Sequence, residues 1–175
     1  MLQRTPMSDI SEPLREEHEQ IFKKIEHLRR AADAVGAAAP EVLGREIDRI
    51  DDFLLHHLLP HALAEEEVLY PAVGKILGTP RATATMSLDH AEISRLAEQL
   101  RKLRAEFAAG AFDAESANDL RRVLYGLYVL TKLHLAKEEE VYLPLLDEHL
   151  GEQEAHELLH KMADVAHRVG APADS

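Results

Sequence analysis

The sequence predicts an all-α protein: an up-down-up-down antiparallel four-helix bundle with a short extra C-terminal helix. Apolar residues recur at steps of three and four along the chain, and no stretch shows the period of two that is typical of strands. Short segments that contain glycine or proline separate the apolar runs. Because short loops place consecutive helices side by side and in opposite directions, this pattern favours a bundle.

Five helices are expected from this spacing. The first begins after Ser11, a residue type that often caps a helix N-terminus, and it ends before Gly36. The second begins near Pro40, where proline is tolerated in a first turn. The remaining breaks are expected at residues 74–80, at residues 110–115 and near Gly151, and the fifth helix should end near Gly170.

Three prolines lie inside the second and fourth helices. Pro60 should kink the second helix, because proline lacks a backbone N–H and its ring strikes the preceding turn. Pro71 and Pro144 lie at equivalent points and are expected to mark the end or a bend of their helices. The inward-facing stripes of the two helices are expected to close with His57, His61, Glu65 and Val68, and with His134, Glu138, Val141 and Leu145.

Length and composition limit the possible functions. The chain of 175 residues predicts one domain, 1–175, with a bundle core at about 11–149 and the C-terminal helix at about 152–169. A net charge of −12 argues against nucleic acid and membrane surfaces as partners. Cysteine is absent, which excludes disulfides, thiolate metal sites and iron–sulfur clusters. We expect a cytoplasmic protein, because neither a signal peptide nor a membrane span is evident, and the sequence does not indicate an oligomeric state.

One pattern of histidine and glutamate occurs twice. In the first half, His18 precedes the pair His61 and Glu65, which has the spacing His-x-x-x-Glu. In the second half, His90 precedes a pair of the same spacing at nearly the same distance. The full set is His18, His61, Glu65, His90, His134 and Glu138.

All six residues fall at inward-facing positions otherwise filled by Leu, Ile and Val. A single inward histidine is usually a hydrogen-bonded core residue. An ionised glutamate in an apolar core, however, costs several kcal/mol unless a cation or a strong partner compensates it. Two such glutamates, each one turn after an inward histidine, therefore predict a site for two metal ions. Imidazole with carboxylate suits iron, whereas a structural zinc site would close with four ligands per ion.

Helix geometry is compatible with such a site, because residues four apart share one face of a helix. His61 and Glu65 can point into one cavity, as can His134 and Glu138. One arrangement pairs His18 with His61 and His90 with His134, with the two glutamates as bridges. The pattern itself does not fix this pairing.

The order His, His-x-x-x-Glu-Glu with Tyr-Pro, His, His-x-x-x-Glu resembles the hemerythrin-like family of cation-binding domains, over about residues 14–146. The resemblance implies a four-helix bundle that holds two iron ions with an oxo or hydroxo bridge and binds O₂ or related small ligands. It also implies that the metal ligands are His18, His61, Glu65, His90, His134 and Glu138.

The chain departs from the oxygen carriers of this family, which have a fifth histidine one turn from the third-helix ligand. Here Ser94 follows His90 by four residues and Met86 precedes it by four. With six protein ligands, both irons would keep an open position. We therefore expect reaction with peroxide or NO, as in a catalase-like or NO-reacting enzyme, or sensing, rather than oxygen transport. The alternative is an iron- or oxygen-responsive module without catalysis.

Several nearby residues are weaker candidates. His57 precedes His61 by four and is a candidate seventh ligand, although its counterpart in the second half is Leu130. Tyr70 and Tyr142 are expected to pack at the end of the bundle, with a gating or ligating phenol as the second interpretation. A solvated acidic face is expected at Glu66, Glu67, Glu139 and Glu140.

Two other metalloprotein classes are less favoured. His156-Glu157-Leu158-Leu159-His160 matches the HExxH string of zinc proteases, but neither a third ligand nor a substrate cleft is evident. Ferritin-type iron oxidases use Glu-x-x-His, whereas this chain has His-x-x-x-Glu.

Overall fold

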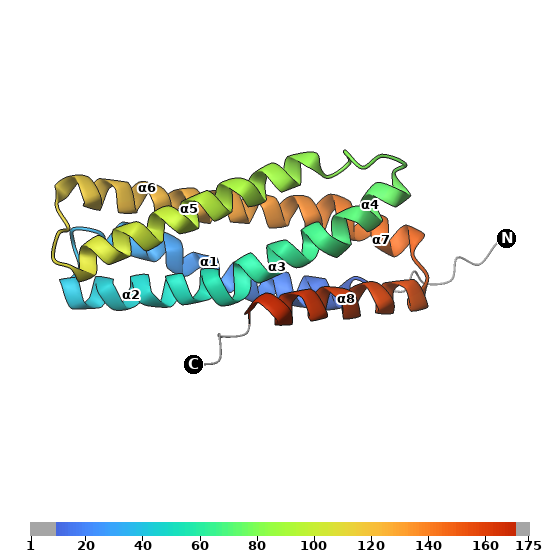
Figure 1. Cartoon of the computed structure of the whole chain (residues 1–175), viewed down its shortest axis with the longest axis horizontal. Helices are drawn as coiled ribbons and strands as arrows, with labels where there is room; N and C mark the ends of the chain where they lie inside the picture. Colours follow the sequence, from blue (N-terminus) through green and yellow to red (C-terminus); the bar gives the residue numbers. More distant parts are fainter. Residues whose placement is uncertain (1–9, 171–175) are drawn as a thin grey trace.

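The computed structural model describes residues 10–170. Within this range the chain consists of helices joined by short loops and contains no strand, so the predicted all-α class is confirmed. Figure 1 shows the helices lying lengthwise in an elongated bundle. Across the described residues, no helix has an apolar stretch of the length needed to span a membrane.

Three segments, η1 to η3, are π-helical turns that interrupt two long helical rods. The first rod runs from α2 to α4 and the second runs from α6 to α7. The elements are α1 (Glu12–Ala34), α2 (Pro40–Phe53), η1 (Leu54–Leu58), α3 (Leu59–Ala64), η2 (Glu65–Leu69), α4 (Tyr70–Ile76), α5 (Ala84–Ala108), α6 (Ala114–Lys137), η3 (Glu138–Tyr142), α7 (Leu143–His149) and α8 (Glu152–Gly170).

The bundle closes through four helix pairs. α1 packs against α2 and α6, and α5 packs against the same two helices. The helix α8 lies outside this ring, along η1, α3 and η2, as Figure 1 shows in red below the cyan-to-green rod. The loops turn at glycines that adopt positive φ: at Gly110, for example, the N–H of Ala111 reaches back to the carbonyl of Glu106 at 2.9 Å and closes the end of α5.

A proline lies two residues after the end of each π-helical turn. The N–H of Leu59, before Pro60, bonds to the carbonyl five residues back, at Leu54. Tyr70 before Pro71 and Leu143 before Pro144 make the same bond, to the carbonyls of Glu65 and Glu138. The wider turn accommodates the proline, so helix continues to Ile76 and His149. Figure 1 shows the first rod changing direction over α3 and α4 rather than ending at its prolines.

Around each π-helical turn, the buried position lies one residue later than a uniform helical period predicts. The sequence-based stripe placed His57, Val68, Val141 and Leu145 inside. The structure instead buries the next residue in each case: Leu58, Leu69, Tyr142 and Leu146. His57 and Val141 are exposed. The expectations for His57 and Val141 were wrong because a uniform period of 3.6 does not hold across a π-helical turn. Val68 and Leu145 are half-buried and pack against the core.

The start of α1 also differs from the sequence-based expectation. Ser11 precedes the helix as predicted, but its hydroxyl does not cap it. The hydroxyl donates instead to the carboxylate of Asp147 at 2.9 Å, as does the Ser11 backbone N–H. The residue therefore ties the start of α1 to α7.

The apolar core has two parts. One cluster fills the half of the bundle that holds most of α1, α2, α5 and α6, and includes Ile25, Leu100 and Leu124. The other fills the half that holds α4, α7 and α8, and includes Leu69 and Met86. Along α1 and α5 the change from one cluster to the other occurs at His18 and His90, which are buried polar residues. A polar layer therefore divides the core across the bundle.

Candidate metal centre

Six polar side chains meet in this layer, and each is nearly inaccessible to solvent. Glu65 and Glu138 are 0% exposed, and even His90, the most exposed of the six, is at 7%. Both glutamates are the first residues of π-helical turns, η2 and η3. The six are the residues singled out by the duplicated pattern: His18, His61, Glu65, His90, His134 and Glu138.

The potential ligand atoms form two groups that share Glu65. Within each group these atoms lie within 4.8 Å of one another. The first group is His18, His61, Glu65 and Glu138, and the second is Glu65, His90 and His134. The histidines thus divide into the two pairs that the sequence allowed but did not fix.

The two oxygens of Glu65 face different histidine pairs. Oε1 lies 2.9 Å from Nε2 of His61 and 3.7 Å from Nε2 of His18. Oε2 lies 3.1 Å from Nε2 of His90 and 3.9 Å from Nε2 of His134. A carboxylate with one oxygen toward each pair has the orientation of a bridge.

Glu138 has the same orientation on the opposite side of the layer. Its Oε2 lies 3.6 Å from Nε2 of His18, and its Oε1 lies 3.4 Å from Nε2 of His134. Each glutamate therefore lies near at least one histidine of both pairs, which is the arrangement that the sequence allowed but did not fix.

An outer carboxylate holds the other nitrogen of each imidazole. Nδ1 of His18 is 2.7 Å from Glu139, and Nδ1 of His90 is 2.8 Å from Glu66. The corresponding distances are 3.1 Å from His61 to Glu17 and 3.2 Å from His134 to Asp89. Because an ionised carboxylate only accepts hydrogen bonds, each Nδ1 carries the proton and each Nε2 points inward. Metal-bound histidines are commonly oriented in this way.

Two of these outer carboxylates correct the sequence-based view. Glu66 and Glu139 were expected on a solvated face, but both contact a central imidazole. Glu139 is also held by Arg15, and Glu66 accepts from Ser87 Oγ at 2.8 Å. Glu17 and Asp89 each directly precede the lone histidine of their half, a repeated feature that the sequence-based interpretation did not use.

Several of the atoms that point into the layer lack a hydrogen-bond partner. Among the described residues, Nε2 of His18, Nε2 of His61, both oxygens of Glu65 and Oε2 of Glu138 are buried without a hydrogen-bond partner. Imidazole lone pairs and carboxylate oxygens both accept, so their convergence needs a proton or a cation between them. The donor set and its unpaired atoms fit metal ions.

The metal-free site compensates in part by binding protons. Burial lowers the pKa of His61, but the carboxylates of Glu65 and Glu17 outweigh this effect and raise the pKa well above its usual value. Burial likewise opposes protonation of His134, whereas Glu138 and Glu65 raise its pKa to about 10. Burial and the charge of Glu65 raise the pKa of Glu138. The excess of negative charge in the layer is therefore what holds these protons.

Tyr70 is a seventh polar group at the centre. Its Oη donates to Glu138 Oε1 at 2.9 Å, and lies 3.4 Å from Nε2 of His90 and 3.3 Å from Nε2 of His134. Burial and the nearby Glu65 and Glu138 raise the pKa of this phenol, so Oη retains its proton. The expectation that Tyr70 packs at the end of the bundle was wrong. Tyr142 does lie away from the histidines, and donates to the backbone carbonyl of Ala82 at 3.2 Å.

A comparison with known protein families identifies the family of this chain. Residues 9–146 match the model of the hemerythrin HHE cation binding domain. The chain belongs to this family. No curated protein and no solved structure was found to match it.

Two positions lie one turn from His90, where hemerythrin-like oxygen carriers have their fifth histidine. Ser94, four residues after His90, is exposed, so its side chain points away from the centre. Met86, four residues before His90, is 1% exposed and belongs to the apolar cluster that includes Tyr70. Met86 is therefore the position from which an added imidazole would face the interior of this hemerythrin-like domain.

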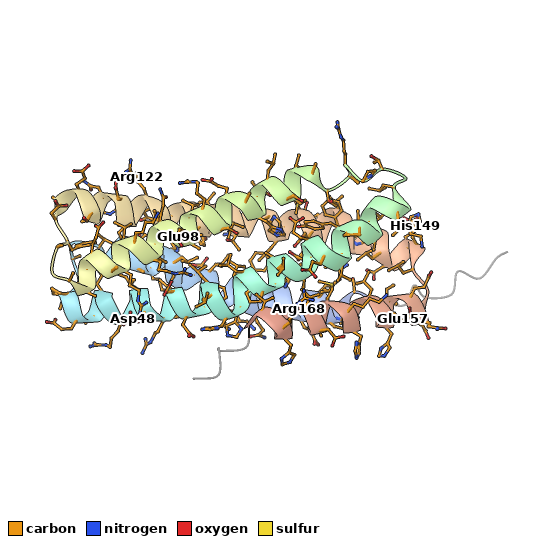
Figure 2. All side chains as sticks on the ribbon, viewed as in Figure 1. Asp48, Glu98, Arg122, His149, Glu157 and Arg168 are labelled. Carbon is orange, nitrogen blue, oxygen red and sulfur yellow. The ribbon has the colours of Figure 1, made fainter. Side chains whose placement is uncertain are left out.

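The remaining metal-binding candidates lie outside both groups. His57 is exposed and stacks on Phe53, with ring centroids 6.2 Å apart. His156 and His160 of the HExxH string are exposed on α8, and Figure 2 places Glu157 on the outer side of that helix. Within residues 10–170, neither histidine belongs to a group of potential ligands. The HExxH string thus gains no support as a zinc site.

The metal-free hemerythrin-like domain should carry a protonated His134 at pH 8, because the pKa of this imidazole is raised to about 10. Nitrogen-15 NMR of the imidazole ring across pH 6 to 11 measures this protonation. Glu138→Gln should lower the pKa, since it removes a carboxylate that stabilises the imidazolium. A neutral His134 at pH 8 in the metal-free protein would contradict this account.

Proposed function

We propose that this protein is a non-haem di-iron protein that binds O₂ or related small ligands and reacts with peroxide or NO, rather than transporting oxygen. Two iron ions with an oxo or hydroxo bridge would be held by the two groups of ligands. The observation that carries the proposal is the convergence of buried, unpaired Nε2 atoms of His18 and His61 on two carboxylates, each of which lies near at least one histidine of both pairs.

Each residue has a defined part in this proposal. His18 and His61 would bind one ion, and His90 and His134 the other. Glu65 and Glu138 would bridge, because their oxygens already point to opposite pairs. Bound iron supplies a change of oxidation state and a place for a small ligand.

The chain's own groups control what happens beside the ions. The apolar clusters on both sides of the polar layer exclude bulk water. Tyr70 holds a proton at Oη beside the His90 and His134 pair and fixes the orientation of Glu138. Its counterpart in the second half of the repeat is Leu143, so the two histidine pairs have different surroundings.

The number of protein ligands favours reaction with peroxide or NO over oxygen transport. Six protein ligands leave places for small molecules at both ions, and the apolar Met86 does not fill one. The second candidate is a non-catalytic module that responds to iron or oxygen. It is favoured by the buried carboxylate oxygens that lack a hydrogen-bond partner, because bound metal would then stabilise the fold.

The first test counts iron. Protein loaded anaerobically should hold two iron ions per chain, and Glu65→Ala or Glu138→Ala should lose at least one because a bridge is removed. Glu157→Ala is the matched control, since this glutamate is exposed on α8. Metal analysis showing one ion per chain, or zinc retained in preference to iron, would exclude a di-iron centre.

A second test concerns Tyr70. Tyr70→Phe should retain iron but change the optical spectrum and slow peroxide consumption by roughly tenfold, because Glu138 loses the donor that orients it. Tyr142→Phe removes a phenol that bonds only to a backbone carbonyl and should behave like wild type. Equal effects in the two variants would show that Tyr70 has no special role.

A third test distinguishes turnover from carriage. The reduced iron protein should oxidise quickly in air, and the oxidised protein should consume hydrogen peroxide faster than free iron does. Met86→His should slow peroxide consumption by adding a buried imidazole beside His90, whereas Ser94→His should not, because position 94 is exposed. Repeated cycles of oxygen uptake and release, without peroxide consumption, would restore the carrier interpretation.

A further inference from the structure

A cavity of about 610 Å³ opens beside the first ligand group, between α1, the η1–α3 segment and the last turns of α8. His61 and Glu17 form part of its wall. His61 is a proposed iron ligand, and Glu17 is the outer carboxylate that holds its Nδ1. The cavity therefore leads from solvent to the back of one metal-binding position.

The lining is rich in groups that bind divalent metal ions. Three histidines that do not belong to the candidate metal centre line the cavity: His56 and His57 from η1, and His167 from α8. Gln20 and Glu17 of α1 add oxygen atoms. Divalent iron takes imidazole nitrogen and carboxylate oxygen as ligands. A second cavity of about 560 Å³ beside Tyr70 has no imidazole in its lining. A smaller cavity of about 250 Å³ is lined by His27 and His57, but its lining does not include a residue of the candidate metal centre.

Glu17 differs from the other three outer carboxylates in its exposure and its partners. Its side chain is 49% exposed, whereas the side chain of Asp89 is 18% exposed. Glu139 is paired with Arg15, Asp89 with Lys137, and Glu66 with the hydroxyl of Ser87. Among the described residues, Glu17 forms its side-chain hydrogen bond or ion pair with His61 alone. One side of its carboxylate is therefore open to a cation in the cavity.

His57 and His167 are also available. Both are exposed, and neither forms a hydrogen bond or ion pair with another residue in the 10–170 range. Burial and the charge of Lys24 lower the pKa of His57, so its imidazole is neutral and can accept a metal ion. Lys24 also lines the cavity, and its ammonium lies over the Phe53 ring, 5.4 Å from its centroid.

We propose that this cavity is the port through which divalent iron reaches the centre, with His57, His167 and Glu17 as successive transient ligands. The inference rests on the proposed di-iron function. The net charge of −12 draws cations toward the protein, and the port supplies nitrogen and oxygen atoms that replace the water around the ion before it reaches His61. His57, an early candidate for a seventh ligand, thus receives a role outside the centre.

The test separates the rate of iron uptake from the amount held. Metal-free protein is mixed anaerobically with Fe²⁺, free iron is captured with a chelator at set times, and retained iron is counted. His57→Ala with His167→Ala should slow uptake by about tenfold while the final iron content and the optical spectrum stay at wild-type values. The matched control is His156→Ala with His160→Ala, which removes two exposed imidazoles outside the cavity.

A direct probe is Mn²⁺ added to protein whose centre is already filled with zinc. Paramagnetic broadening should reach the ring signals of His57 and His167 before those of His156 and His160. Three results would contradict the proposed port. They are unchanged uptake in the His57→Ala, His167→Ala variant, equal slowing in the control variant, and Mn²⁺ broadening without this preference. A low final iron content in wild-type protein would instead refute the di-iron function.

Discussion

The structure depends on one electrostatic constraint: acceptor atoms face acceptor atoms in a dry layer. Glu65 and Glu138 bring four carboxylate oxygens to four imidazole nitrogens whose other ring nitrogens are already hydrogen-bonded outside. Such a layer is repulsive unless positive charge occupies it, and protons on His61 and His134 supply only part of that charge. The two apolar clusters stabilise the helices, but the layer between them sets what the bundle must bind.

The helical class and the six converging residues could be predicted because each depends on local spacing. Inward position follows from steps of three and four, and duplication shows which polar residues act together. The outer carboxylates also repeat, since Glu17 and Asp89 each precede a lone histidine, but the helical period does not show which imidazole each of them holds. Glu66 and Glu139 lie next to the inward glutamates, where the helical period assigns them to solvent, and Glu17 and Asp89 are far in sequence from the imidazoles they hold.

Tyr70 was misplaced for a related reason. Its distance from Glu65 along the chain suggested a position beyond the centre, at the end of the bundle. The π-helical turn Glu65–Leu69 rotates the residues that follow, and the phenol comes to lie against His90 and His134. The earlier π-helical turn, Leu54–Leu58, explains in the same way why Leu58 rather than His57 is buried. Residues in α-helical segments, such as Ile47 and Ile50 before the first π-helical turn and His61 after it, were placed correctly because the period of 3.6 holds within those segments.

The π-helical turns also bear on how such chains diverge. One residue corresponds to about 100° of rotation about a helix axis, so a single-residue insertion normally turns every later side chain to a new face. A π-helical turn absorbs that insertion locally, and the three examples here each stand beside a proline that disfavours a return to the α-helical register. A relative that lost one residue before Glu65 or Glu138 would keep its helices and its composition, yet present a different set of side chains to the centre.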